Sequence, residues 1–192
     1  MLLAGTRIPD RYLKLPFDGT NNVSSNLNID HQSKIDKFQL AIVNCCAISN
    51  TRVELESFLN LFNVDLLCGT ESHLNESILN SEVFPANYHV YRKDRNIHGG
   101  GIFILVKSNI PSSQVKYNTS IELIWVWIHN NTDSNIIIGS FYCPPHSPIT
   151  VLDELAQSIS DIRTMYPSTK IIIGGDFNSP GINWSNKSLI TS

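Results

Sequence analysis

A short stretch late in the 192-residue chain constrains the fold most, because three isoleucines are followed at once by two glycines and an Asp-x-Asn pair over residues 171–178. The apolar residues from 170 to 173 predict a buried strand. Two glycines at its end let the backbone approach closely and aim Asp176 and Asn178 at one point. The chain is therefore expected to bury a strand whose end carries chemistry.

The first half of the ordered region begins with a strand, a helix and a second strand. Residues 38–43 and 64–68 are short apolar strands. Residues 52–62 have helical spacing of apolar side chains, with Asn50 or Thr51 as the expected N-cap. Two strands separated by one helix indicate a βαβ unit.

Four strand-like segments then follow with short turns, at residues 88–91, 101–106, 121–128 and 135–142. Short connections favour antiparallel pairing. An amphipathic helix with apolar residues from Val151 to Ile162 ends near Tyr166, before the strand at 170–173. The whole pattern predicts an α/β (α+β) fold in which two mixed β-sheets pack face to face with helices outside.

Composition limits the organisation to one core. The chain is 42% hydrophobic and 16% charged, and residues 1–36 mix Pro, Gly, Asn and Ser without periodicity. We expect residues 1–36 to be a flexible leader and residues 37–192 to form one domain. The net charge of -3 gives no global electrostatic reason to expect nucleic-acid binding.

The sequence also gives an expectation for the cellular compartment of the protein. No apolar run is long enough for a membrane span, and Arg7 and Asp10 interrupt the apolar N-terminus before a signal sequence develops. The four cysteines lie in or beside apolar strands without metal-binding spacing, as expected of reduced core or strand-end thiols. We expect an intracellular protein, nuclear or cytoplasmic and not secreted.

Polar residues stand at the ends of three predicted buried strands: Asn44, Glu71 and Asp176. In open α/β sheets ligands bind at that edge. Mg²⁺ prefers oxygen ligands, usually one or two carboxylates completed by water and phosphate. Each residue alone is better explained as a turn residue or a solvated acid, but together they predict a magnesium site, with Mn²⁺ as an alternative ion.

These segments resemble the endonuclease/exonuclease/phosphatase superfamily, which has a DNase I-like four-layer sandwich. The shared motifs cover about three quarters of the chain and are VNC, GTES, GGG, FYCPP and GGDFN. Within the superfamily the closest resemblance is to the endonuclease domain of LINE-type, non-LTR retrotransposon polyproteins. That resemblance adds Tyr91 to Arg95 before GGG, and Trp184 after GDFN.

The resemblance implies a role for each motif residue. Glu71 with Asn44 would hold the metal ion. Asp176 would orient or deprotonate the attacking water, and Asn178 and Tyr142 would bind phosphate oxygens. Contacts to DNA are expected from three further residues: Arg92, Arg95 and Trp184.

The chain departs from the family pattern in several places. Cys143, His73 and Asn183 replace a basic residue, a tryptophan and an acid that are common in the family, so phosphate or DNA contacts are expected to be weaker. The superfamily also uses a histidine in an Asp-His motif near its C-terminus, and nothing after Asn178 supplies it. The sequence is therefore expected to hold an incomplete domain whose sheet edge is exposed.

Three functions fit these observations. The first is Mg²⁺-dependent DNA nicking by a retrotransposon-derived endonuclease domain that is present here as an incomplete fragment, with the reverse transcriptase region of the same polyprotein as its partner. The second is a cellular phosphatase or repair nuclease of the same superfamily. The third is a catalytically dead relic or interaction module.

Overall fold

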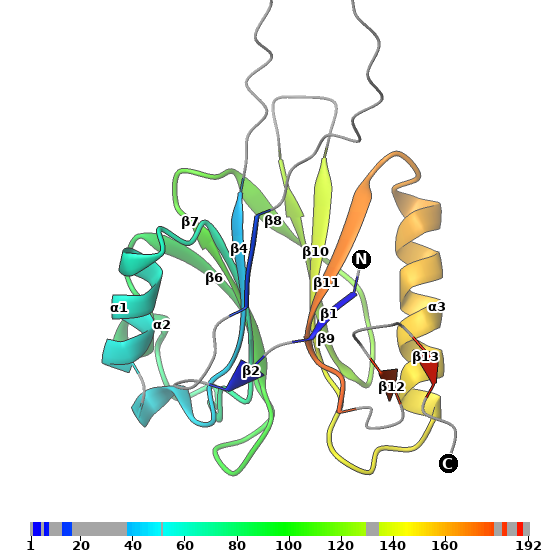
Figure 1. The fold of residues 1–192 in the computed structure, drawn as a ribbon, viewed down its shortest axis with the longest axis horizontal. Coiled ribbons are helices and arrows are strands. Elements are labelled where there is room, and N and C mark those ends of the chain that lie inside the picture. Colours follow the sequence, from blue (N-terminus) through cyan, green and yellow to red (C-terminus); the bar gives the residue numbers. More distant parts are fainter. Residues whose placement is uncertain are drawn as a thin grey trace, which may run out of the picture.

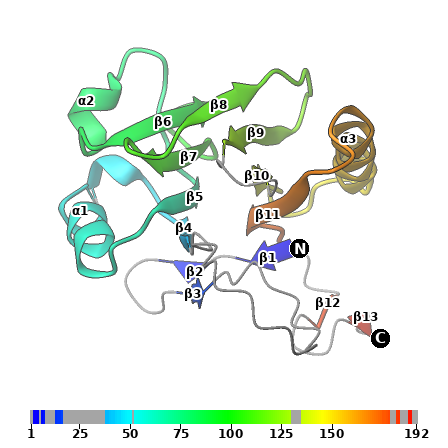
Figure 2. The same ribbon diagram turned by 90° about the horizontal axis from the view of Figure 1, so that it is seen from above.

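Two β-sheets packed face to face between helices make up the protein, as a computed structural model shows (Figure 1). The structure describes residues 38–50, 52–129 and 135–178, together with the backbone of five short strands outside these ranges. Figure 2 shows the order of the layers from above: α1 and α2, then one sheet, then the other sheet, then α3. This is the predicted fold class. No helix in the described ranges is long and apolar enough to cross a membrane.

The first sheet has strand order β2-β4-β5-β7-β6, and β3 also pairs with β4, next to β2. β4 and β5 are parallel, whereas β5, β7 and β6 pair antiparallel. Its strands are β2 (Thr6–Arg7), β3 (Leu13–Pro16), β4 (Gln39–Asn44), β5 (Leu66–Thr70), β6 (Tyr88–Lys93) and β7 (Ile102–Lys107). Its helical segments are η1 (Ile48–Asn50), α1 (Arg52–Leu61) and α2 (Asn80–Val83).

The second sheet has strand order β1-β11-β10-β9-β8. β10 and β11 are parallel and are connected through α3, whereas β8, β9 and β10 pair antiparallel. Its elements are β1 (Leu2–Ala4), β8 (Ser112–Val115), β9 (Glu122–Ile128), β10 (Ile136–Tyr142), α3 (Thr150–Met165) and β11 (Lys170–Asp176). A separate hairpin joins β12 (Ile182–Asn183) to β13 (Ser188–Leu189).

Three apolar layers separate these elements. The layer between the sheets consists mainly of branched side chains, such as Ile104 and Ile138, from the inner faces of both. Leu55 and Phe58 of α1 pack on the outer face of the first sheet, and Leu155 and Ile162 of α3 pack on the outer face of the second. Strands buried on both faces lose the alternation of polar and apolar residues, which explains the continuous apolar runs in the sequence.

The predicted order of elements is confirmed, including the βαβ start and the antiparallel middle. Val53 was predicted on the apolar stripe of α1 but is 72% exposed, because the buried face of that helix is formed by Leu55, Phe58 and Leu59. α2 and β8 were not predicted; both are four residues long and mostly polar. The expected leader includes β1, β2 and β3, so part of it pairs with the two sheets.

Gly139 in the middle of β10 makes room for the largest buried side chain of the second sheet. Its register partner on β9 is Trp125, whose indole N–H donates to Ser158 of α3 at 2.9 Å. A Cβ at residue 139 would lie 2.5 Å from the Trp125 ring. The glycine therefore lets one tryptophan fill the space between sheet and helix.

We predict that Gly139→Ala lowers the free energy of unfolding by about 1–3 kcal/mol, because the tryptophan must leave its well-packed position. Urea denaturation of the 192-residue chain measures this change. Gln114→Ala, on the exposed face of β8, is the control and should change stability by no more than about 0.5 kcal/mol. An alanine at 139 that leaves the unfolding midpoint unchanged would show that the ring has room to move.

Candidate functional site

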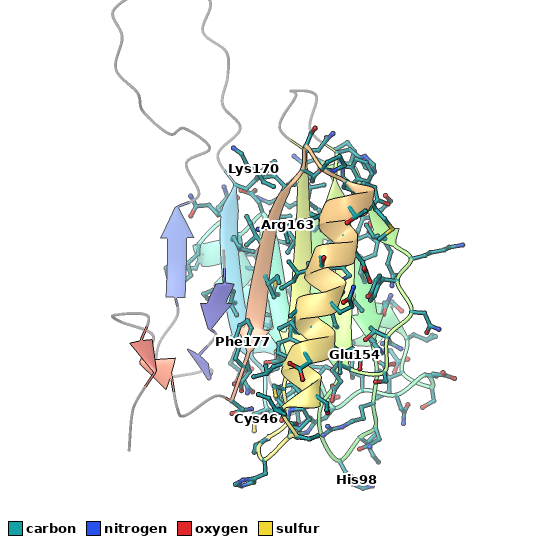
Figure 3. All side chains as sticks on the ribbon, turned by 90° about the vertical axis from the view of Figure 1, so that its right-hand side faces the viewer. Cys46, His98, Glu154, Arg163, Lys170 and Phe177 are labelled. Atoms are coloured by element: carbon teal, nitrogen blue, oxygen red, sulfur yellow. The ribbon has the colours of Figure 1, made fainter. Side chains whose placement is uncertain are left out.

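Four strands, two from each sheet, end at one edge of the sandwich and carry the polar motif residues. Asn44 ends β4, Glu71 follows β5, Tyr142 ends β10 and Asp176 ends β11. Figure 3 shows Cys46 and Phe177, which are near neighbours of these residues in sequence, toward one end of the molecule and Lys170 toward the other. The predicted meeting of polar residues at a sheet edge is therefore present, and both sheets contribute to it.

The Asn44 side chain connects these carboxylates. Its amide nitrogen Nδ2 donates to Glu71 Oε1 at 3.0 Å and to Asp176 Oδ2 at 3.1 Å. Its carbonyl oxygen accepts the Cys46 backbone N–H at 3.2 Å, which fixes the orientation of the amide. Asn44 is 3% exposed. One buried amide thus holds an acid of the first sheet beside an acid of the second.

The backbone around Glu71 is held in an unusual conformation. Glu71 and His73 both have a φ of 52°, in the left-handed region that non-glycine residues seldom occupy. Three backbone hydrogen bonds hold this turn: Glu71 C=O accepts from Ala47, Ser72 N–H donates to Gly101, and His73 N–H donates to Gly100. Left-handed residues kept in place by surrounding structure are common at functional sites.

Tyr142 lies beside Glu71. Burial, together with the charge of Glu71 and a hydrogen bond to its carboxylate, raises the pKa of Tyr142 to about 12. The phenol therefore stays protonated at neutral pH and remains a hydrogen-bond donor. The Arg95 guanidinium carbon lies 5.8 Å from the centroid of the Tyr142 ring, within the range of a cation–π contact.

The ends of β10 and β11 are tied together. Tyr142 and Asp176 are register partners, and the Cys143 N–H donates to the Asp176 carbonyl at 2.9 Å. Asn178 adds two further hydrogen bonds at these ends. Its side-chain amide donates to the Cys143 carbonyl at 2.8 Å, and its backbone N–H donates to Asp176 Oδ1 at 3.1 Å. These bonds fix Asp176 and Asn178 relative to Tyr142.

The donor chemistry of the site suits a hard divalent cation. Glu71 and Asp176 each have two carboxylate oxygens with about four acceptor positions, and the hydrogen bonds above use only part of that capacity. The described residues contain no cluster of three or more His, Cys, Asp or Glu side chains. A site with two carboxylates and open positions fits Mg²⁺, which keeps several waters, better than a metal that needs a full set of protein ligands.

The predicted basic residues have different environments. Arg95 lies at the site, with its side chain 39% exposed and ion-paired to Glu122 at 2.8 Å. Arg92 is directed into the fold, where its guanidinium donates to the carbonyls of Asn75 and Ile78. Lys93 donates to two carbonyls of the segment that precedes β9. Trp184 lies outside the described residues.

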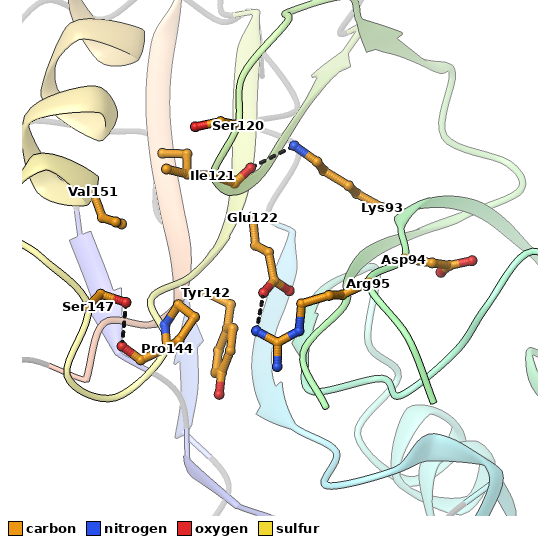
Figure 4. Close-up of a pocket in the computed structure, with 10 residues that line it drawn as sticks. All are labelled: Lys93, Asp94, Arg95, Ser120, Ile121, Glu122, Tyr142, Pro144, Ser147 and Val151. Carbon is orange, nitrogen blue, oxygen red and sulfur yellow. Dashed lines mark hydrogen bonds and ion pairs between the residues drawn. The ribbon is translucent and has the colours of Figure 1, made fainter. Parts of the chain in front are cut away.

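Glu122 is a site residue that the sequence analysis missed. It lines a hollow of about 330 Å³ beside Tyr142 (Figure 4). This hollow lies between the turn after β6 and the segment that precedes α3. The walls of this hollow are apolar at Pro144 and Val151 and basic at Arg95. The signal available in the sequence was an acid at the start of an apolar strand, and the structure adds that this acid lies opposite Tyr142.

Comparison with known sequences gives two partial matches. A family model described as endonuclease-reverse transcriptase matches residues 136–189. The RNA-directed DNA polymerase from the mobile element jockey of Drosophila funebris is 26% identical over 136 residues, which are 69% of this chain and 14% of that protein. The chain therefore spans only a small part of this relative.

Solved structures share the fold. The endonuclease domain of TRAS1, a telomere-specific non-LTR retrotransposon, has a TM-score of 0.54 and 20% identity over 74% of this chain and 59% of its own. The human Nocturnin catalytic domain has a TM-score of 0.53 and 13% identity over 70% and 61%. The 3'-5' exonuclease NExo from Neisseria meningitidis has a TM-score of 0.50 and 18% identity over 74% and 59%.

The fold and these matches relate the chain to the endonuclease/exonuclease/phosphatase superfamily. Within the superfamily, the jockey polymerase and the TRAS1 domain relate it to the endonucleases of LINE-type, non-LTR retrotransposons. The resemblance seen in the sequence motifs is thereby confirmed.

We predict that Asn44→Ala lowers the free energy of unfolding by about 1–3 kcal/mol, because two partly buried carboxylates lose the amide between them. Urea denaturation in EDTA measures the change without any contribution from metal. Asn60→Ala, at an exposed position of α1, is the matched control and should change stability by no more than about 0.5 kcal/mol. Equal stability of the Asn44 variant and the parent chain would contradict the bridging role.

The cysteines beside the site should differ in reactivity. Burial raises the pKa of Cys45 and of Cys68 to about 12, so both remain neutral thiols near pH 8, whereas Cys46 is exposed. We expect iodoacetamide to modify Cys46 and to spare Cys45 and Cys68 in the folded protein, because the thiolate is the nucleophile. Peptide mass spectrometry identifies the modified residues. All four should react in urea, and fast labelling of Cys45 in the native chain would contradict the described turn.

Proposed function

We propose that the chain is a Mg²⁺-dependent endonuclease domain that nicks DNA. The observation that supports this best is the meeting of Asn44, Glu71, Tyr142, Asp176 and Asn178 at one edge of the sandwich. Two acids, a protonated phenol and two amides suit the hydrolysis of an anionic ester, since they combine metal ligands, hydrogen-bond donors and a base.

Glu71 and Asp176 would hold the metal ion, and Asn44 would keep their carboxylates together through its amide nitrogen. This differs from the roles implied by the family resemblance, in which Asn44 supplies a ligand and Asp176 acts on the attacking water. Mg²⁺ would supply a Lewis acid that neutralises charge on the scissile phosphate and on the leaving oxygen, and Mn²⁺ would suit the same oxygen ligands.

The side chains would divide the remaining chemistry. Asp176 would orient a water molecule and accept its proton as the water oxygen bonds to phosphorus. The bond from phosphorus to the ester oxygen would break, and that oxygen would take a proton from solvent water. Tyr142 would donate its O–H to a phosphate oxygen, which its raised pKa permits. Asn178, exposed at the end of β11, would offer a further hydrogen bond to the same phosphate.

DNA is proposed as the substrate because the sequence match is to a mobile-element polymerase and the fold match includes a retrotransposon endonuclease domain. Arg95, at the rim of the site, would contact phosphate. The reverse transcriptase region of such a polyprotein is the proposed partner. A phosphatase or repair nuclease of the same superfamily is the second candidate, since the fold also matches an exonuclease.

We expect the 192-residue chain to convert supercoiled plasmid to the nicked circle with Mg²⁺, and to stop when EDTA removes the metal. Glu71→Ala and Asp176→Asn should each lower the rate by about 100-fold or more, because each removes charge from the centre of the site. Glu56→Gln, an exposed acid on α1, is the control and should nick like the parent. Nicking that survives in Glu71→Ala would contradict the proposed site.

A binding measurement separates the enzyme from a catalytically dead relic. Mg²⁺ that binds only the folded protein raises its unfolding temperature, and Glu71→Ala should abolish that rise. A metal-dependent rise without nicking would indicate that the site binds an ion but does not cleave. No rise and no nicking would indicate a non-catalytic module.

A further inference from the structure

Glu122 brings a carboxylate into the rim of the candidate site from the start of β9. It is opposite Tyr142 in the register of β9 and β10, and its side chain is 12% exposed. A charge at such a position is costly unless hydrogen bonds satisfy it. Both oxygens have partners: Oε1 accepts from Arg95 Nη1 at 2.8 Å, and Oε2 accepts from the Gly101 N–H.

These two bonds connect the sheets at the site. Glu122 belongs to the second sheet, whereas Arg95 and Gly101 flank the turn between β6 and β7 of the first. The same turn accepts the N–H groups of Ser72 and His73 through Gly101 and Gly100. Glu122 therefore holds the connection between β6 and β7, and this connection supports the backbone after Glu71.

The Arg95 guanidinium has one nitrogen without a hydrogen-bond partner among the described residues. Its Nε donates to the Gly99 carbonyl and its Nη1 donates to Glu122, so Nη2 has no hydrogen-bond partner in the described part of the chain. The fit is tight, because a Cβ at residue 100 would lie 2.4 Å from the guanidinium carbon and 2.7 Å from Glu122 Oε1. A planar guanidinium fixed on one side presents its other side to phosphate in a set geometry.

We propose that Glu122 is a positioning residue, which holds Arg95 over the Tyr142 ring so that the free amino group of the arginine contacts a phosphate of the bound DNA strand. This inference rests on the proposed function. Figure 4 shows the arrangement, with the Arg95 guanidinium bonded to the Glu122 carboxylate and lying beside Tyr142.

The direction in which Glu122→Gln changes the affinity for DNA distinguishes a positioning role of Glu122 from a purely electrostatic effect of its charge. Phosphate contacts dominate DNA affinity, so the loss of a negative charge near the binding surface should strengthen binding if charge alone mattered. Positioning predicts the opposite, because Arg95 without its partner samples many rotamers and must be ordered again when DNA binds. The variant Glu122→Gln keeps an oxygen acceptor for the Gly101 N–H and removes the charge that attracts Arg95.

The test measures binding of a short fluorescent DNA duplex by anisotropy, in EDTA and over a range of salt concentrations. Arg95→Ala should weaken binding about 5- to 20-fold and reduce the slope of log affinity against log salt by about one. Glu122→Gln should weaken binding about 3- to 10-fold in the parent chain but less than about twofold in the Arg95→Ala chain. Glu82→Gln, an acid that accepts a backbone N–H at the start of α2, is the matched control and should bind like the parent.

Each outcome decides the inference. An effect of Glu122→Gln that depends on Arg95 supports positioning, because damage to the fold would weaken both backgrounds alike. Equal effects in both backgrounds, or binding as tight as the parent or tighter, would overturn positioning while leaving the proposed function intact. A parent chain that neither binds the duplex nor nicks plasmid would overturn both proposals.

Discussion

The hydrogen bonds from the Asn44 amide to Glu71 and Asp176 are the interaction on which the candidate site depends, since they join residues 132 positions apart in sequence across two sheets. Two carboxylates at one edge repel each other unless a donor or a cation lies between them. The amide nitrogen supplies that donor, and its orientation is fixed by the Cys46 N–H on the carbonyl side. A side chain without both a donor and an acceptor could not satisfy the two sheets and the turn at once.

This interaction works only because the sheets meet at a fixed distance. The apolar layer between them, with Ile104 and Ile138 among its members, sets that distance. Tight packing of the layer means that a change of register on either sheet would move an acid away from the amide. Gly174, within β11, has Ile42 of the facing sheet against it, so that a Cβ there would lie 2.9 Å from that isoleucine. Gly174 of the GGDFN motif therefore allows the close contact between the two sheets.

The sequence was sufficient to predict the layers, the order of the long buried strands and the meeting of Asn44, Glu71 and Asp176, because buried strands leave continuous apolar runs whose polar ends share an edge. It could not predict that Asn44 offers nitrogen and not oxygen to the acids, since that depends on where the Cys46 N–H lies. It treated Arg92 and Arg95 alike, although only the fold shows that Arg92 donates to the carbonyls of Asn75 and Ile78. Glu122 was missed because its partners, Arg95 and Gly101, are distant in sequence.

The different environments of the basic residues affect how a chain with a net charge of -3 could bind a polyanion. The site places two carboxylates where a phosphate would sit, so electrostatics without a cation disfavour binding. Arg92 and Lys93 donate to backbone carbonyls, and each positions a loop. Among these three basic residues near the site, Arg95 keeps an amino group at the rim that has no partner among the described residues. Phosphate recognition would then depend on the metal held by the acids and on Arg95 in a fixed orientation, so the loss of either should have a larger effect than in a protein with a broad basic surface.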